Sequence, residues 1–506
     1  VRRLQSHRVL AINRGEKEGK LKVTLEADEN EEIAAVTRAA LHPKNPFGDW
    51  LRAVCADSWN RLLFPSLERE TRSELTDAAN EQAIRTFALN LRPLLMQPPV
   101  RGRVTLGFDP AYRTGCKLAV VDATGKVLET AVIYPTPPHK KTEDAKCTLR
   151  RLCDKHHITC IAIGNGTASK ESEIFVADFI KEYGGGIAYM VVSEAGASVY
   201  SASKLGAEEF PDFDVSLRSA VSIARRLQDP LAELVKIDPK AIGVGQYQHD
   251  MPQARLSEAL DGVVEDCVNA VGVDLNTASP ALLSRVAGVT NTVSKNIAAY
   301  REQNGRFESR KQLLKVKGLG PKAFEQCAGF LRVPDGANLL DRTGVHPEAY
   351  EAAQTLLTLC GYTAEDAAQG KISELPARVK QLGAADTAKR CGVGVPTLHD
   401  IVDELMRPGR DPRDELPPPM LRSDVLDLND LKPGMKLKGT VRNVADFGAF
   451  VDIGVHQDGL VHISQLCNRY VKHPSEVVTV GDIVDVAVLS VDPKSHRIAL
   501  TMKNVK

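Results

Sequence analysis

The sequence predicts a multidomain, mostly α-helical protein that contains one α/β domain and ends in a small β-barrel. At 506 residues the chain is too long for a single hydrophobic core, so three to five domains are expected. Apolar residues recur at helical spacing over much of the chain, whereas short strands alternate with helices after Val104 and five short strands close the sequence. The hydrophobic share of 43% and the charged share of 26% are typical of globular domains.

Residues 1–100 are predicted to be mostly helical, because apolar side chains recur at helical spacing from Trp50 to Leu95 before Pro98 and Pro99 break the pattern. Arg8–Gly15 is the exception and is interpreted as a strand that enters a turn. Since the chain starts at Val1 and that strand follows at once, we expect the sequence to start inside a domain, with a further segment upstream.

Residues 101–215 are predicted to form an α/β domain. Three strands follow one another at 105–109, 117–122 and 126–134, and helices at about 140–156 and 171–183 then alternate with strands at 160–163 and 188–192. A three-strand meander followed by alternating helix and strand indicates a mixed sheet.

The remaining segments differ clearly in composition. We expect a helical connector at 216–275, short helices with glycine turns at 276–335 and 336–406, a proline-rich linker at 407–429, and the barrel at 430–506. The barrel strands are expected at 434–444, 447–453, 458–463, 483–491 and 497–502. Five short strands in about seventy residues suit a small barrel of the OB type.

The barrel carries side chains that suit nucleic-acid binding. Phe447 and Phe450 flank two small residues, and His462 lies on the next strand. Flat rings stack on bases and cations bind phosphates. The candidate cations are Lys438, Arg442, Arg469, Lys472 and Arg497. The alternative is that the phenylalanines belong to the core, because residues three positions apart face opposite sides of an ideal strand.

The run Asp446–Asp452 together with Gly459–Ser464 resembles the S1-type RNA-binding domain. The resemblance implies that Phe447, Phe450 and His462 line an RNA face, with Arg497 and Asp492 as further members. Single-stranded RNA is therefore the expected partner of the barrel.

A second candidate site lies at Leu313–Phe324, where Gly318 and Gly320 allow a sharp turn before a helix. The free N–H groups of that helix and three lysines would bind phosphates without reading bases. These lysines are Lys315, Lys317 and Lys322. The alternative is an ordinary helical turn, but residues 276–335 hold ten Lys/Arg and four Asp/Glu, a balance of 10 − 4 = +6.

The same region resembles a tandem helix–hairpin–helix domain. Its first hairpin would be Val286–Thr290, which departs from the pattern because Thr290 stands where a second glycine is expected. The second hairpin is therefore the better candidate for a phosphate site, on DNA or RNA.

Asp109, at the end of the first α/β strand, and the hairpin that follows it resemble the start of an RNase-H-like domain of the YqgF, or RuvC-like, type. Such nucleases hold two metal ions on several carboxylates. Such a metal site would need a second acid after Ile163, but the sequence there offers Asn165, which carries no charge. The other candidate acids are Glu194, Asp261 and Glu265, the last two on one helical face.

Each acid also has a simpler interpretation. Asp109 precedes Pro110 and suits a turn, whereas Asp261 and Glu265 suit a solvated helix face. Because the second carboxylate is missing, we expect a degenerate domain kept for binding or scaffolding, with a metal-dependent nuclease as the alternative. No metal site and no cofactor are expected, and Mg²⁺ enters only under the nuclease alternative.

The order of these parts, together with the run Lys236–Asp250, resembles the bacterial Tex family of transcription accessory proteins. The resemblance implies a factor that binds nucleic acid and acts on transcription, with a helix-turn-helix-like region ahead of residue 1. A protein scaffold for the polymerase or ribosome is a third possibility. The transcription machinery and DNA are thus candidate partners besides RNA.

Charge, hydropathy and cysteine content bear on the partners and the cellular compartment of the protein. Lys+Arg and Asp+Glu are both 65, but a net charge of zero leaves nucleic-acid binding open, since local basic surface decides that affinity. No apolar run reaches the roughly 18 residues of a membrane span. Ten scattered cysteines suit reduced thiols, so a cytoplasmic protein is expected.

Overall fold

The computed structural model describes residues 4–505 with the exception of 41–45, 185, 244, 420, 422–430, 456–457, 493–496 and 504. Of the expected proline-rich linker at 407–429, residues 420 and 422–429 lie outside the described residues. The chain forms two compact units, one of Val1–Leu89 with Val244–Leu260, the other of Asn90–Gly243 with Asp261–Lys506. Among the described residues no helix combines the length and the apolar composition that crossing a membrane requires.

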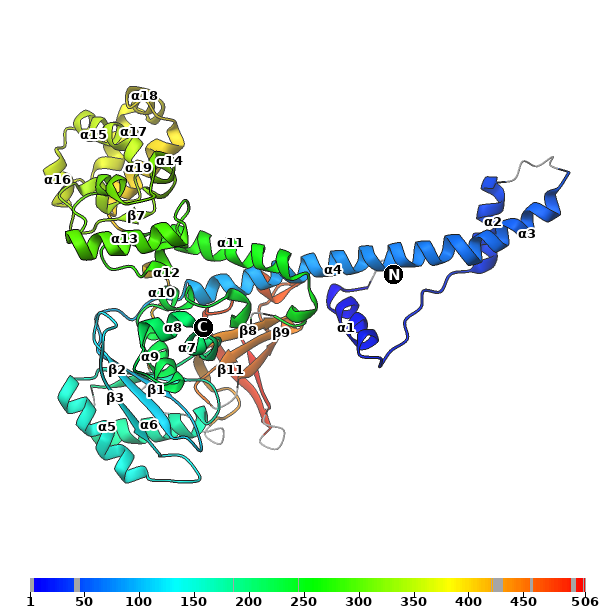
Figure 1. Ribbon diagram of the computed structural model, residues 1–506, viewed down its shortest axis with the longest axis horizontal. Helices are drawn as coiled ribbons and strands as arrows, with labels where there is room; N and C mark the ends of the chain where they lie inside the picture. The colour runs from blue at the N-terminus through cyan, green and yellow to red at the C-terminus, as the bar shows by residue number, and fades with distance from the viewer. Residues whose placement is uncertain are drawn as a thin grey trace. The chain divides into compact units, whose positions relative to one another are not determined.

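The first unit is helical, as expected for the N-terminal part, and its long helix α4 is labelled in Figure 1. Its elements are α1 (Ser6–Lys17), α2 (Glu29–Ala40), α3 (Gly48–Ser58), the π-helical turn η1 (Trp59–Leu63), most of α4 (Phe64–Leu95), η3 (Gln248–Asp250) and the start of α11 (Gln253–Val271). Phe87 of α4 is 3% exposed, and a side chain at Gly245 would collide with its ring. The glycine therefore lets the distant segment around residue 245 pack onto α4.

The strand expected at Arg8–Gly15 is wrong, because this segment lies within helix α1. Asn13 and Glu16 stand three positions apart and thus share one helical face. The Asn13 side-chain amide donates a 2.9 Å hydrogen bond to Thr76 of α4, and Glu16 forms an ion pair with Arg72. These contacts to a helix far along the chain stabilise α1 as a helix.

The second unit begins with a five-stranded mixed sheet, as predicted. Its strands are β1 (Thr105–Asp109), β2 (Cys116–Val121), β3 (Val127–Ile133), β4 (Cys160–Gly164) and β5 (Ala188–Val192), in the order β3-β2-β1-β4-β5. The pairs β1–β2 and β2–β3 are antiparallel, whereas β1–β4 and β4–β5 are parallel. The parallel pairs bring the ends of β1, β4 and β5 to one edge of the sheet.

Helices cover both faces of this sheet (Figure 1). On one side lie α5 (Thr142–His156) and α6 (Ser169–Tyr183), and on the other α9 (Val215–Gln228). Helix α9 packs closely on β1, because a Cβ atom at Gly107 would lie 2.0 Å from the Ala220 carbonyl oxygen. Because helix α9 packs on the sheet, the α/β domain extends to Gln228, beyond the expected boundary at residue 215.

Short helices build the next part of the second unit. They are α7 (Ala197–Ala202), α8 (Lys204–Glu209), α10 (Pro230–Leu234), η2 (Pro239–Ile242), α12 (Pro280–Leu283), α13 (Asn291–Asn304), η4 (Arg310–Lys315), α14 (Pro321–Cys327), η5 (Leu339–Arg342), η6 (Pro347–Ala349), α15 (Tyr350–Leu359), α16 (Ala364–Ala368), α17 (Leu375–Leu382), α18 (Ala384–Arg390), α19 (Val395–Met406) and η7 (Pro412–Glu415). Two short strands, β6 (Val273–Asp274) and β7 (Leu331–Arg332), pair in parallel across the ends of the hairpin region.

Arg310 joins two parts of this helical region. Its side chain is 1% exposed, and its guanidinium donates to the Leu331 carbonyl at 2.6 Å, to the Val345 carbonyl at 2.7 Å and to the Tyr350 hydroxyl at 3.0 Å. It also donates to the Thr343 carbonyl. Buried polar groups need such partners, so one side chain fixes both neighbouring segments.

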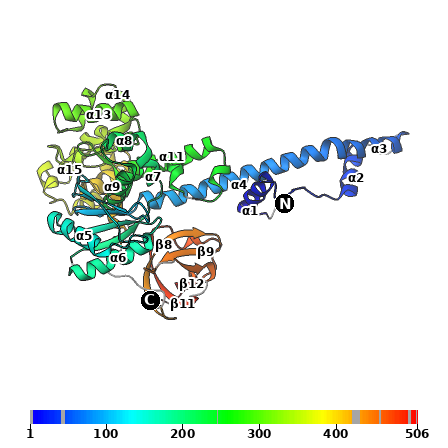
Figure 2. The same ribbon diagram turned by 60° about the horizontal axis from the view of Figure 1, so that its bottom comes forward.

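The chain ends in the predicted closed barrel, drawn in orange and red in Figure 2. Its strands are β8 (Lys436–Ala445), β9 (Gly448–Asp452), β10 (Gly459–His462), β11 (Ile483–Asp492) and β12 (Arg497–Thr501), with two 3₁₀ turns, η9 (Ile463–Gln465) and η10 (Pro474–Glu476). Alternate residues such as Val451, Val461 and Leu500 are at most 1% exposed and fill the interior. The residues between them therefore form the outer face.

Candidate nucleic-acid interface

The barrel presents two phenylalanine rings side by side on its surface. Phe447 is 51% exposed, and its ring centroid lies 6.0 Å from that of Phe450, with an angle of 88° between the planes. Phe450 is half-buried and pairs with Leu460 on the outer face of β9 and β10. Such an edge-to-face pair leaves one flat surface of a ring open to a further partner.

The local backbone explains how both rings reach the same side. Ala445 pairs with Gly448, so Asp446 and Phe447 form the two-residue turn between β8 and β9. Phe447 is therefore outside the strand, and the strict alternation of faces does not apply to it. The alternative that the phenylalanines belong to the core rested on that alternation. It does not hold for Phe447, which lies in the turn and is exposed.

His462 completes the cluster on the adjoining strand. It pairs with Gly448 in the β9–β10 ladder and is exposed. Its Nδ1 accepts a hydrogen bond of 3.3 Å from the Ser464 backbone N–H, which places the ring proton on Nε2. The histidine thus offers a flat ring and a donor while its orientation is fixed at the start of η9.

Arg442 is the predicted cation nearest to the rings along β8, and it is already paired. Its Nη2 atom lies 2.7 Å from the Asp452 carboxylate, and the two side chains are 31% and 11% exposed. A phosphate would have to compete with this carboxylate. The sequence named Arg442 but did not reveal Asp452 as its partner, because a β-bulge shifts the register between Val441 and Asn443.

Two further candidate cations on the barrel strands, Lys438 and Arg497, are exposed but differ in position. Lys438 lies on β8, five residues before Asn443, the partner of Phe450, which at about 3.3 Å per residue is about 16 Å away. Arg497 begins β12, two residues before Ala499, and Ala499 pairs with Leu460. Arg497 is therefore the closer of the two to the rings.

The helix–hairpin–helix region forms two hairpins that pack on each other. Gly318 has φ +86° and Gly288 has φ +78°, so both hairpins use the left-handed region that glycine adopts without strain. A side chain at Gly288 would meet Gln326 of α14, and the Asn296 amide of α13 donates to the Lys317 carbonyl at 2.7 Å. Helix α14, which follows the second hairpin, thus contacts the first hairpin, and helix α13, which follows the first hairpin, contacts the second.

The second hairpin keeps its glycines accessible. Val316 and Leu319 are 3% and 4% exposed, whereas Gly318 and Gly320 face solvent. Pro321 is the first residue of α14 and has no N–H, so the free donors there belong to the next residues of the helix. The three predicted lysines are all exposed around this turn: Lys315, Lys317 and Lys322.

In the first hairpin Thr290 takes the place of the second glycine for a structural reason. It is the N-cap of α13, and its hydroxyl accepts a hydrogen bond of 3.3 Å from the Val293 N–H. This bond satisfies a donor that a phosphate would otherwise bind. The second hairpin therefore remains the better candidate for phosphate contact.

Two of the four candidate acids meet at the edge of the mixed sheet. Burial, opposed by a hydrogen bond from Ser219 and aided by the charge of Glu194, raises the pKa of Asp109 to about 6. Burial also raises the pKa of Glu194, whose carboxylate is held by the Gly166 N–H. Asn165 accepts a 2.9 Å hydrogen bond from the Glu194 backbone N–H.

The other two candidate acids, Asp261 and Glu265, lie on helix α11. Asp261 forms an ion pair of 2.6 Å with Arg285, and Glu265 is exposed one turn further on. Across the described residues no group of three or more His, Cys, Asp or Glu side chains is placed to hold a metal ion. With an amide at Asn165 and a hydroxyl at Ser219, the donors at Asp109 and Glu194 do not fit a two-metal centre.

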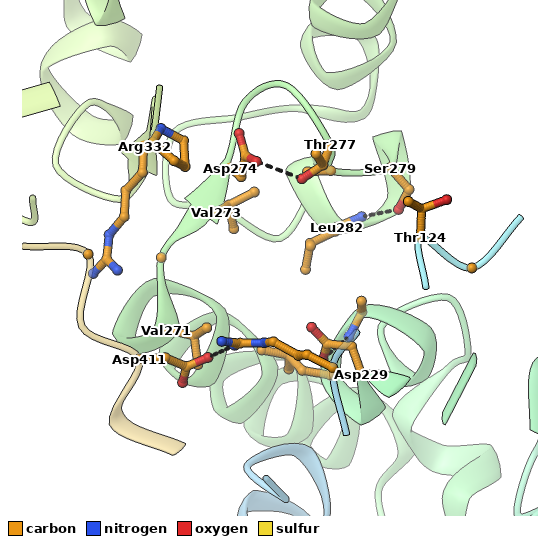
Figure 3. A pocket seen from close by; sticks show the side chains of 18 of the residues that line it. Thr124, Asp229, Val271, Val273, Asp274, Thr277, Ser279, Leu282, Arg332 and Asp411 are labelled. Atoms are coloured by element: carbon orange, nitrogen blue, oxygen red, sulfur yellow. Dashed lines mark hydrogen bonds and ion pairs between the residues drawn. The ribbon is translucent and has the colours of Figure 1, made fainter. Parts of the chain in front are cut away.

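A pocket of about 1050 Å³ in the second unit was not anticipated from the sequence (Figure 3). Arg413, whose side chain is 2% exposed, pairs there with Asp411 at 2.8 Å and with Asp229 at 2.7 Å. Thr277 and Asp274 share a 2.8 Å hydrogen bond on another part of its wall, as Figure 3 shows. The Arg413–Asp229 ion pair joins residues 184 positions apart, so no local pattern reports it.

Comparison with known families covers nearly the whole chain. The family models that match are, in chain order, Tex central region-like (residues 1–87), Tex protein YqgF-like domain (103–228), helix-hairpin-helix motif (268–332), HHH domain (338–413) and S1 RNA binding domain (430–503). The YqgF-like match ends at residue 228, where helix α9 also ends.

Several curated relatives are similar along almost the full chain. "Uncharacterized protein YdcI" of Bacillus subtilis is 53% identical over 99% of this chain and 70% of its own length. "Protein tex" of Bordetella pertussis is 51% identical over 99% of this chain and 65% of its own length. "Transcriptional accessory protein Tex" of Neisseria gonorrhoeae is 50% identical, with coverage of 99% and 66%. The chain thus spans about two thirds of the length of these relatives, and it belongs to the Tex family.

Proposed function

We propose that this chain is a nucleic-acid-binding transcription accessory factor that holds single-stranded RNA on its barrel and phosphates on its second hairpin. The observation that carries the proposal is the cluster of the exposed Phe447 in the β8–β9 turn with the half-buried Phe450 and the exposed His462 on the outer face of β9 and β10. Three flat rings on one surface suit unstacked bases, which a duplex does not offer.

The composition of the face favours a single strand over a protein partner. Arg442 and Arg497 lie on the same outer surface as the rings, and each ring is supported by backbone that the barrel holds in place. Stacking is tolerant of sequence because every base has a π-face. Affinity with little base preference is therefore expected.

The second hairpin supports a contact to the phosphate backbone. Exposed Gly318 and Gly320 allow close approach, and three exposed lysines add charge that a phosphate would neutralise. Binding that releases counterions weakens linearly on a log scale as salt rises. The hairpins could engage RNA or DNA, and both are included in the test below.

A role in transcription is supported by the family. The relatives named above include proteins described as Tex and as a transcriptional accessory protein, and the matches extend over at least 99% of this chain. Contact with the transcription machinery is part of the proposal. Co-purification of polymerase components that survives nuclease treatment would support it.

The proposal is tested by measuring the affinity of the full chain for single-stranded RNA, single-stranded DNA and duplex, with and without Mg²⁺. The double variant Phe447→Ala with His462→Ala should weaken RNA binding by at least about fivefold, the loss of one stacked base. Leu489→Ala, which trims another exposed apolar side chain of the barrel, is the matched control. Equal RNA affinity in the double variant and the control would refute the proposed RNA face.

A further inference from the structure

The loop between η9 and η10 carries an aromatic ring that the RNA face described above does not include. Tyr470 is 86% exposed, compared with 51% for Phe447. A tyrosine ring normally gains free energy from burial, so a ring this exposed on a folded domain is a candidate contact surface.

The loop itself is firmly held on both sides of the tyrosine. Leu466 is 2% exposed in the barrel core and Val471 is 6% exposed. Cys467 donates a 3.5 Å hydrogen bond to the Arg469 carbonyl. With its neighbour Val471 buried, the Tyr470 ring is presented to solvent by ordered backbone and is not the tip of a loose segment.

A side-chain contact holds this loop against the turn that carries Phe447. This contact is a hydrogen bond: the His473 Nε2–H donates to the Asp446 carboxylate at 3.0 Å, and Asp446 precedes Phe447 in the β8–β9 turn. Tyr470 is three residues from His473, a span of at most about 10 Å. The tyrosine therefore lies on a loop that is held against the β8–β9 turn which carries Phe447.

The charge of the loop suits a phosphate backbone that runs past the ring. Arg469 and Lys472 flank the tyrosine, both are exposed, and residues 467–473 contain no Asp or Glu. An aromatic ring between two cations matches the pattern by which proteins hold single strands, with a base on the ring and phosphates on the cations.

We propose that Tyr470 is a further stacking platform for the same single-stranded RNA, holding a base beyond those on Phe447, Phe450 and His462. The inference rests on the proposed function and extends the length of strand that the barrel binds. It predicts that Tyr470 matters only for an RNA long enough to reach it.

The test uses the full chain and oligouridylate RNAs of about four and about twelve nucleotides, which span the site sizes of OB-type domains. Tyr470→Ala should weaken binding of the longer RNA by at least about fivefold and leave the shorter RNA unchanged. Tyr470→Phe, which keeps the ring, should restore the affinity. Phe447→Ala should weaken both RNAs, and Leu489→Ala neither.

The outcomes separate the two proposals. If Phe447→Ala weakens both RNAs but Tyr470→Ala behaves like Leu489→Ala, the extended site is wrong and the proposed function stands. If Phe447→Ala leaves both affinities unchanged, the proposed function itself fails. If Tyr470→Phe is as weak as Tyr470→Ala, the ring does not act by stacking and the inference is overturned. Circular dichroism of each variant checks that the barrel remains folded.

Discussion

Substitution of Gly448 by alanine should separate the two strands that bring the rings of the proposed RNA face together. A Cβ atom at this position would lie 2.3 Å from the Val461 carbonyl oxygen and 3.0 Å from the His462 Cα atom. Carbon–oxygen contacts in sheets normally lie at about 3.3–3.6 Å. Because both neighbours are backbone atoms of β10, the strands must move apart by about 1 Å.

The size of the effect follows from that displacement. Overpacking of a well-packed site typically costs about 1–3 kcal/mol of stability. Gly448 pairs directly with His462 and follows Phe447, so the same movement displaces two of the three rings. RNA affinity should therefore fall by at least about fivefold, equivalent to one lost base stack.

Hydrogen exchange of the β9 and β10 amides measures the strand opening, and fluorescence anisotropy with labelled RNA measures the affinity. Gly262→Ala on α11 is the matched control, since a Cβ there meets nothing within 4 Å and alanine favours a helix. Exchange and affinity in Gly448→Ala that equal those of the control would refute the reasoning, because the close approach would then be unnecessary.

Three further predictions concern other parts of the chain. Arg310→Met should destabilise the helical region by about 1–3 kcal/mol because it leaves buried acceptors unpaired, and an unfolding free energy within about 0.5 kcal/mol of that of the unaltered chain, measured by denaturation or hydrogen exchange, would contradict this. Each of Lys315→Gln, Lys317→Gln and Lys322→Gln should lower the slope of log affinity against log salt by about 0.7–0.9, and an unchanged slope in all three would remove the hairpin from the interface. The pKa of Asp109 is raised to about 6 in the folded chain. Below about pH 4 the carboxyl group is protonated whether the chain is folded or unfolded, and the protein keeps its full stability. As the pH rises through about 6, ionisation favours the unfolded chain and this stability is lost. Asp109→Asn should therefore stabilise the protein above pH 7 by up to about 3 kcal/mol, and a pH profile of unfolding identical to that of the unaltered chain would count against this.

Local sequence patterns predicted most elements of the α/β domain and the barrel. The expected strand at 188–192 coincides with β5, and β11 was expected at 483–491 against the observed Ile483–Asp492. Strand alternation, helical spacing and glycine turns each depend on residues a few positions apart, so one sequence is sufficient to find them.

Longer-range features could not be found in this way. Arg8–Gly15 forms a helix because Asn13 and Glu16 contact α4, and the boundary at residue 215 moved because α9 packs on Gly107. The pairing of Asp261 with Arg285 likewise depends on where α11 lies. Each of these contacts joins segments whose proximity only the folded chain creates.

The sequence by itself determined that the barrel has five strands and that Phe447, Phe450 and His462 are the rings to consider. Only the tertiary structure decided that Phe447 lies in a turn beside Phe450, that Arg442 is engaged by Asp452, and that Tyr470 is exposed three residues from His473, which contacts Asp446. The physical reason is that side-chain identity is local, whereas exposure and ionic pairing depend on strand register and on loops that the rest of the barrel positions.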